Sequence, residues 1–201
     1  MTLVRLTLPA LAVALAVGGC VPASAPTAPA STATAPATAP NPTVGGATMR
    51  ADRTIVANAA AAPNLTTLVA AVRAAGLAET LSGAGPFTVF APTDEAFGRL
   101  APGMLDTLLK PENKATLARV LTYHVVPGMI TAADLRARIA AGGGSANLRT
   151  VAGDLLTARV EEGAVTLTDM NGTRTYVETP DVRQSNGVVH VVNGVLVPRL
   201  G

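Results

Sequence analysis

The sequence contains very few of the residues that build disulfide scaffolds and metal centres. Its 201 residues include one cysteine, two histidines, two tyrosines, three phenylalanines and no tryptophan. A single cysteine cannot form an intramolecular disulfide, and a structural zinc site takes four ligands, usually cysteine or histidine. This scarcity excludes a disulfide framework and predicts that the protein holds no zinc.

The sequence also lacks a large excess of positive or negative charge. Lysine and arginine total 15 against 13 aspartates and glutamates, which gives a formal net charge of +2. The basic residues are spread singly along the chain, and few aromatic residues accompany them. Nucleic-acid-binding domains concentrate basic residues on one face. The sequence therefore predicts no nucleic-acid partner.

Catalytic motifs are absent as well. The chain contains no G-x-S-x-G elbow, no phosphate-binding P-loop, no H-E-x-x-H and no S-x-x-K. The adjacent carboxylates Glu161 and Glu162 precede a glycine, and we interpret them as a solvated turn between strands. We therefore expect a protein that is not an enzyme, with no catalytic residues and no cofactor.

The first 19 residues have the pattern of an export signal. Arg5 precedes a run from Leu6 to Val17 that is apolar apart from Thr7 and Pro9 and is too short to span a bilayer comfortably. Val17-Gly18-Gly19-Cys20 resembles a bacterial lipobox, in which the cysteine is acylated and becomes the first residue after cleavage. Membrane lipid would then be a partner through Cys20, and the protein would be lipid-anchored to the bacterial envelope. The alternative is a plain secretory signal with an incidental cysteine.

Residues 20–51 are predicted to form a disordered tether between this anchor and a folded domain. The segment is rich in proline, alanine and threonine and carries no charge before Arg50. It has too few bulky apolar residues to offset the entropy lost on ordering. Residues 52–201 remain as one domain of ordinary size, which we expect to be monomeric.

Within that domain the hydrophobic period changes along the chain. Leu65, Leu68, Val69 and Val72 follow helical spacing, with Asn64 expected to cap the start of this helix and Gly76 to end it. Thr93 or Asp94, after Pro92, is expected to cap another helix, and Thr131 to Asp134 form a variant capping box for a third. From Leu148 onward the period is two, with strands expected over 156–160, 164–168, 174–177, 188–192 and 195–197. Helices first and strands later predict an α+β fold.

Two sets of side chains are candidates for function. His124 lies at a helix end, and His190 lies in a strand of valines. They could form a metal pair or supply a general base, but we interpret both as core histidines fixed by hydrogen bonds. Asp181 and Val182 follow Pro180 in a candidate contact loop, whose alternative is an ordinary strand entry.

Three segments resemble the signature of the fasciclin family. Phe87–Phe97 (FTVFAPTDEAF) is similar to the first fasciclin box, Tyr123-His124 to the tyrosine–histidine motif, and Asn186–Pro198 (NGVVHVVNGVLVP) to the second box. The helix over Leu68–Leu77 is similar to the opening helix of the family. The resemblance covers nearly all of residues 52–198.

The resemblance implies small helices packed on a twisted two-sheet β-sandwich, a β-wedge, and a role in adhesion at cell surfaces. In animal members the tyrosine–histidine segment and an Asp-Ile-type dipeptide are linked to partner binding. Those positions correspond to Tyr123 and His124, and to Asp181 and Val182. We therefore expect a membrane-anchored module that binds a protein or polysaccharide. The alternative is a small-molecule-binding lipoprotein of the periplasm, such as a sensor or transport accessory.

Overall fold

The computed structural model describes residues 41–83, 85–100 and 103–199. The predicted signal peptide, the acylation site Cys20 and the tether up to residue 40 lie outside the described residues. No helix within the described ranges combines the length and the apolar character that crossing a membrane requires.

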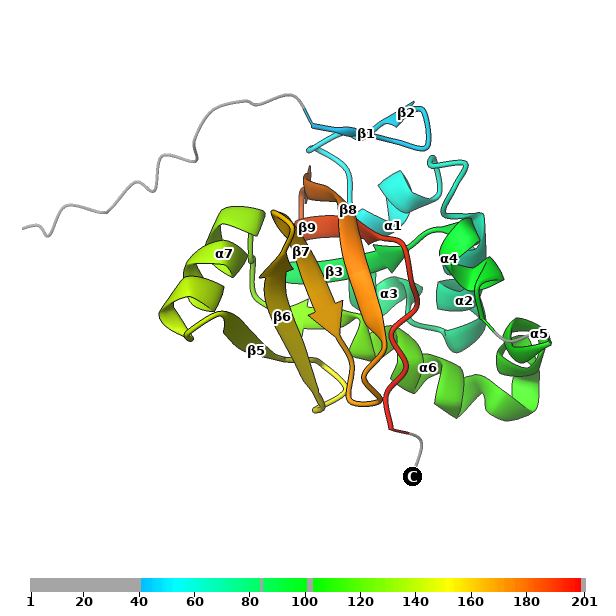
Figure 1. Ribbon diagram of the computed structural model, residues 1–201. Helices are drawn as coiled ribbons and strands as arrows, with labels where there is room; N and C mark the ends of the chain where they lie inside the picture. Colours follow the sequence, from blue (N-terminus) through cyan, green and yellow to red (C-terminus); the bar gives the residue numbers. More distant parts are fainter. Residues whose placement is uncertain (1–40, 84, 101–102, 200–201) are drawn as a thin grey trace, which may run out of the picture. The chain divides into compact units, whose positions relative to one another are not determined.

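Helices and strands follow in the order that the sequence predicts, helices mainly first and strands mainly last (Figure 1). The helical elements are α1 Ile55–Ala59, α2 Thr66–Ala75, α3 Ala78–Ser82, α4 Asp94–Gly98, α5 Met104–Leu109, the 3₁₀ turn η1 Pro111–Asn113, α6 Lys114–Tyr123 and α7 Ala132–Ala141. The strands are β1 Thr43–Val44, β2 Ala47–Thr48, β3 Phe87–Pro92, β4 Val125–Pro127, β5 Ser145–Arg149, β6 Leu155–Glu161, β7 Ala164–Thr168, β8 Arg174–Gln184 and β9 Gly187–Val192.

Seven of the described strands join in the hydrogen-bonded order β4-β3-β9-β8-β7-β6-β5. The pairing of β3 with β9 is parallel, from Phe87 opposite Gly187 to Pro92 opposite Val192. The other pairs are antiparallel. The two fasciclin-like boxes therefore lie side by side at the centre of the fold, and the predicted α+β class is confirmed.

The long strand β8 connects the two halves of this sheet. Its first residues pair with β7 and its last residues with β9. Two register shifts, between Val177 and Thr179 and between Thr179 and Val182, interrupt its pairing with β9. Bulges of this kind bend a strand and increase its twist. The first half of β8 can therefore belong to the β5–β6–β7 layer and the second half to the β3–β9 layer.

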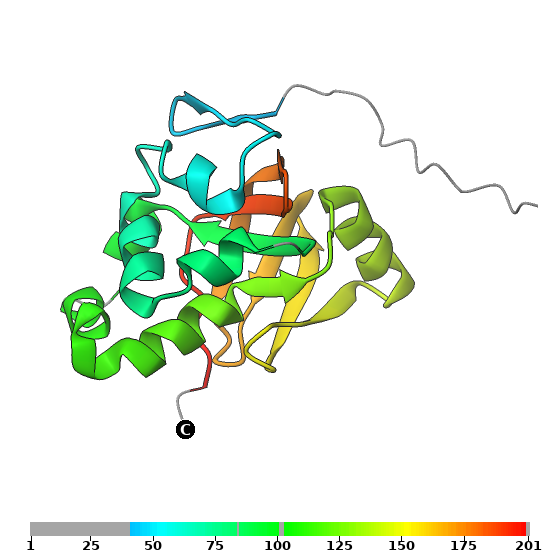
Figure 2. The ribbon, with the colours of Figure 1, turned by 180° about the vertical axis from the view of Figure 1, so that it is seen from behind.

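The central strands are buried on both faces, which explains their lack of charge. On one face Val89, Ala91, Val189 and Val191 pack with α1, α2, α4 and α6 in the first core. Figure 2 shows these cyan and green helices in front of the sheet. On the other face Phe90 and Val192 join a second core that includes residues of α7, β5, β6 and β7.

Short polar motifs begin and end the helices, as predicted. The Thr93 side chain accepts from the Ala96 N–H at the start of α4. Thr131 and Asp134 form a reciprocal capping box at α7. Gly76 ends α2 with a positive φ of 74°, a conformation that glycine adopts without strain.

One cap comes from a distant part of the chain. Asn64 was predicted to cap α2, but the Asp94 carboxylate does so, accepting from the N–H groups of Thr66 and Thr67. Partial burial acts to raise the pKa of Asp94. The two backbone hydrogen bonds and a third hydrogen bond from the Thr66 hydroxyl outweigh it and hold the pKa below its ordinary value.

One predicted boundary and several predicted elements need correction. Residues 43–48 form a hairpin, and Val44 and Met49 are buried in the first core, so the fold includes residues assigned to the tether. Asn41 also exchanges two hydrogen bonds with the backbone of Arg183. Residues 195–197 do not form a strand, and β5 and α5 were not predicted. The hairpin was missed because composition alone does not reveal packing against a distant core.

Candidate functional site

Tyr123 and His124 end helix α6 and lie in the interior. Tyr123 is 0% exposed and His124 is 1% exposed. The Tyr123 hydroxyl donates to the Leu155 carbonyl at 2.9 Å, and burial raises the pKa of Tyr123 to about 12. Neither side chain is available to contact a partner at the surface of this fold, contrary to the role that the resemblance implied.

Both nitrogens of the His124 ring are engaged. Nε2 accepts from the Leu196 N–H at 3.0 Å, so Nδ1 carries the proton and donates to the Val120 carbonyl at 2.8 Å. Burial lowers the pKa of His124 to about 4, although the Val120 bond and the nearby Asp169 act in the opposite direction. This histidine is therefore neutral at pH 7 and attaches the segment after β9 to helix α6.

His190 joins three segments on the other face of the sheet. Its Nδ1 accepts from the Asp181 N–H at 3.2 Å, and its Nε2 donates to the Ile130 carbonyl at 2.9 Å. The ring stacks on Phe90 with centroids 5.6 Å apart. Burial lowers its pKa below the ordinary value, opposed by the Ile130 bond and by Asp181. His190 thus connects β9, the bulged part of β8 and the segment that enters α7.

The two histidines bind different backbone groups and do not converge. Within the described ranges, no three histidine, cysteine or acidic side chains gather where they could hold a metal ion. With both ring nitrogens hydrogen-bonded, neither imidazole in this conformation offers a free lone pair for a metal or a substrate proton. The arrangement is suited to holding segments together.

Asp181 and Val182 also have positions that the sequence did not predict. Val182 is 1% exposed and belongs to the first core. The Asp181 carboxylate accepts from the Ala132 N–H at 2.8 Å, at the first residue of α7, and Asp181 has a positive φ of 58°. Its carboxylate therefore stabilises the start of a helix and is not a freely exposed contact group.

We expect Asp181→Ala to lower the free energy of unfolding by about 1–2 kcal/mol, because it removes this helix cap and places alanine at a positive φ. Asp181→Asn, which keeps an oxygen acceptor and tolerates that backbone conformation, should lose clearly less. Urea unfolding at pH 7 measures both. Equal stability of Asp181→Ala and the wild type would contradict this role. If Asp181→Ala also binds a partner less well, its loss of stability has to be measured before the lost binding is assigned to a direct contact.

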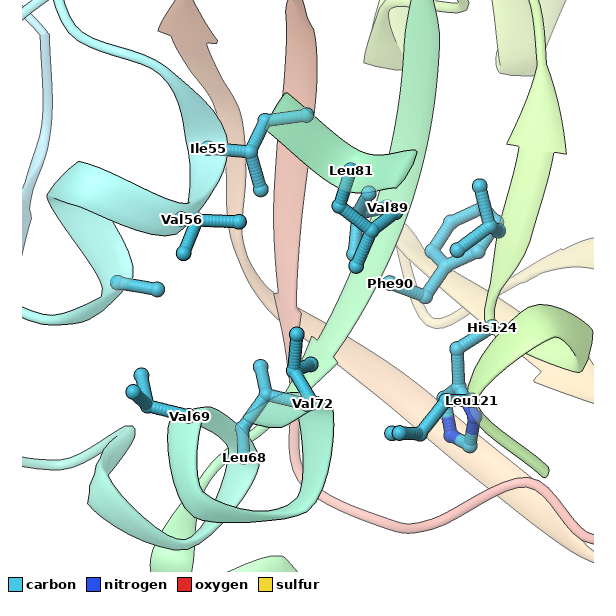
Figure 3. A pocket seen from close by; sticks show the side chains of 12 residues that line it. Ile55, Val56, Leu68, Val69, Val72, Leu81, Val89, Phe90, Leu121 and His124 are labelled. Atoms are coloured by element: carbon cyan, nitrogen blue, oxygen red, sulfur yellow. The ribbon is translucent and has the colours of Figure 1, made fainter. Parts of the chain in front are cut away.

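An apolar pocket lies between the helices and the central strands (Figure 3). Figure 3 shows aliphatic side chains of α1, α2, α3 and β3 around it, with His124 as the one polar side chain among its lining. Its volume is about 30 Å³, far below the roughly 300–1,000 Å³ of typical small-molecule sites. It offers neither the space nor the convergent polar groups that such a ligand needs.

The surface carries a more polar hollow that the sequence did not indicate. It measures about 220 Å³ and lies between the end of α4, the start of β8 and residues 193–195 after β9. Arg99, Arg174, Tyr176 and Asn193 contribute to its lining, and we call it the two-arginine groove. These residues are far apart in the sequence and share no motif, so no local signal could have identified them.

Comparisons with known proteins agree with the signature segments. The fasciclin domain model matches residues 63–198. Protein sll1483 of Synechocystis is 47% identical over 145 residues, covering 72% of this chain and 73% of that relative. The uncharacterized protein sll1735 of the same organism is 41% identical over 143 residues, covering 71% of this chain and 96% of that relative.

The fold has a counterpart among solved structures. A pair of FAS1 domains from fasciclin I, an insect cell adhesion molecule, superposes with a TM-score of 0.62 at 24% identity. The match covers 74% of this chain and 51% of the insect chain. At that identity the likeness concerns the fold alone. Because the fasciclin domain model accounts for more than half of the chain, this protein belongs to the fasciclin family.

Proposed function

We propose that this protein is a lipid-anchored protein of the bacterial envelope whose fasciclin domain mediates adhesion by binding a protein or polysaccharide. Membership of the fasciclin family is the observation that carries the proposal. The fold also matches domains of an insect cell adhesion molecule. The lipobox-like residues that end at Cys20 would place such a domain at a membrane surface.

The interior of the domain supports binding at the surface over binding inside. The apolar pocket is small, and the ring of His124 beside it already uses both nitrogens. A small-molecule-binding lipoprotein would need a larger cavity with converging polar groups. The outer surface, including the two-arginine groove, is therefore the better place for a partner.

The anchor can be tested through Cys20. Growth with a fatty-acid probe should label the wild-type protein, and the Cys20→Ala variant should carry no label and leave the membrane fraction. The physical reason is that each buried methylene of an acyl chain contributes about 0.8 kcal/mol to membrane attachment. Equal membrane retention of both proteins would contradict the anchor.

The same Cys20→Ala variant supplies a soluble bait with the rest of the full chain intact. Immobilised on beads and mixed with envelope extract from the native host, it should retain a specific protein or polysaccharide. Protease treatment and periodate oxidation of the extract would distinguish the two classes. Free bait should compete for the retained material. Recovery of nothing above empty beads would contradict an adhesive function.

A further inference from the structure

The two-arginine groove has walls from three separate parts of the chain. Arg99 directly follows α4, Arg174 and Tyr176 are at the start of β8, and Asn193 follows β9. Figure 1 shows the segment after β9, in red, running beside β8, in orange. The groove is thus a product of the tertiary fold, formed where this segment lies beside the strand that connects the two sheet layers.

Positive charge dominates the groove. Arg99 and Arg174 are both exposed, and none of the described residues that line the hollow is acidic. Arg99 donates to the Asn193 carbonyl at 3.2 Å through Nη1. A guanidinium has five N–H donors, so with this one bond to the described residues Arg99 keeps further donors for a ligand. A planar guanidinium matches a carboxylate or phosphate with two parallel hydrogen bonds.

Among the described residues, the second arginine makes only a weak contact. Arg174 Nη1 lies 3.5 Å from Glu161 Oε2, and 61% of the arginine side chain and 29% of the glutamate side chain are exposed. Exposed ion pairs of this kind contribute little stability. A carboxylate of a ligand can therefore replace Glu161 at small cost.

The floor of the groove is already ordered. The Tyr176 N–H donates to the Asn193 side-chain oxygen at 2.9 Å, and the Asn193 N–H donates to the Tyr176 carbonyl at 3.1 Å. This reciprocal pair holds the end of β9 against β8. Groups that are fixed before binding lose less conformational entropy when a ligand arrives.

The groove also exposes an aromatic ring and has a modest size. Tyr176 is 39% exposed, one of the few large apolar side chains at the surface of the described fold. A volume of about 220 Å³ lies below the range of drug-sized ligand sites, and suits one unit of a longer chain. A sugar ring combines an apolar face, which can cover a tyrosine, with hydroxyl groups for an amide such as Asn193.

We propose that the two-arginine groove binds an acidic sugar unit, such as a uronate, within an anionic polysaccharide. The sugar carboxylate pairs with Arg174 and Arg99, and the ring lies against Tyr176. This inference rests on the proposed adhesive function and gives it a surface and a ligand class. Neighbouring polar residues extend the path for the chain, because Thr157, Thr168 and Arg174 lie in register across β6, β7 and β8.

The test is calorimetric titration of the full-chain Cys20→Ala protein with oligogalacturonate, with its fully methyl-esterified form as the uncharged control. Oligogalacturonate should bind, and the affinity should fall as salt is raised, since exposed charges are screened. The methyl ester should bind at least tenfold more weakly. Equal affinity for the ester, or no binding of oligogalacturonate, would overturn the proposal.

Substitutions locate the site. Arg174→Gln and Arg99→Gln should each weaken oligogalacturonate binding about tenfold, which corresponds to about 1.4 kcal/mol. Arg183→Gln, which makes the same charge change at the far end of β8, should stay within about twofold of the unmutated bait. Glu161→Gln should not weaken binding and should strengthen it at most slightly, because the exposed pair that it removes contributes little. An equal loss in Arg183→Gln, or weaker binding by Glu161→Gln, would contradict the assignment.

Other probes separate this inference from the function on which it rests. Polyglutamate and a single-stranded DNA oligonucleotide serve as acidic ligands without a uronate. If either binds as tightly as oligogalacturonate, the groove recognises an acidic peptide or a phosphate chain equally well, and the proposal is overturned. If the bait retains envelope material while oligogalacturonate fails to bind, the groove inference falls and the adhesive function stands. If the bait retains nothing and oligogalacturonate binds, the adhesive function falls and acidic-sugar binding by the groove stands.

Discussion

Gly187→Ala should destabilise the domain by at least about 3 kcal/mol, a large share of the 5–15 kcal/mol that stabilises a typical domain. A methyl group on Gly187 would lie 2.0 Å from the Phe87 carbonyl oxygen and 2.9 Å from the Phe87 nitrogen. These atoms are backbone and cannot rotate away. The strands β3 and β9, which pair in parallel at this point, would have to separate.

The damage should extend beyond this strand pair. Asn186, the residue before Gly187, accepts from the Ile55 N–H and donates to the Leu81 carbonyl, so it joins the start of α1 to α3. A shift at Gly187 therefore disturbs the helix layer as well as the sheet. Overpacking against backbone is costly because a close-packed interior has little free space to absorb it.

Gly98→Ala is the matched control. Gly98 ends helix α4, and a methyl group there meets nothing within 4 Å. Its unfolding free energy should stay within about 0.5 kcal/mol of the wild type, as for other surface substitutions. Urea unfolding of the three proteins at pH 7 provides the comparison. A Gly187→Ala protein as stable as Gly98→Ala would refute the close approach of β3 and β9.

Mild acid should destabilise the domain through its two histidines. In the unfolded chain each has a pKa near 6.5, and in the folded protein burial lowers the pKa of His124 to about 4 and also lowers that of His190. The unfolded state then binds more protons below pH 6.5. Stability is therefore full above about pH 6.5 and falls as the pH drops toward 4.

The size of the effect follows from the same pKa values. Each histidine contributes a slope of at most about 1.4 kcal/mol per pH unit. His124 alone should remove about 2 kcal/mol between pH 7 and pH 5, and His190 should add to this loss. Most carboxylates stay ionised over that interval, so the histidines dominate it.

Two measurements check this expectation. Urea unfolding at pH 7, 6 and 5 should give a falling free energy of unfolding. Nuclear magnetic resonance of the imidazole protons should show two signals that do not titrate near pH 6.5 while the protein is folded, and the chain has only two histidines to assign. Constant stability from pH 7 to pH 5, or a histidine that titrates near 6.5, would be inconsistent with buried neutral rings.

Local chemistry was enough to predict much of the fold. Thr93, the Thr131–Asp134 capping box and Gly76 mark helix ends because a side chain or a permissive backbone acts within a few residues. The alternation of residues 156–160 and 164–168 predicted β6 and β7 because side chains of a strand point to opposite faces. The signature segments identified the family without any structure.

The sites depended on contacts between distant residues, which no local pattern contains. Asp181 looked like an exposed loop residue, yet its carboxylate reaches the start of α7. Tyr123 and Val182 resembled contact residues, yet both are buried. Likewise, the groove between Arg99 and Arg174 exists only because β9 carries the following segment alongside β8.

The amino-acid sequence alone determined the elements, their ends and the family, because caps and periodicity act over a few residues. The tertiary structure decided which side chains face solvent, because burial depends on what the rest of the chain packs against them.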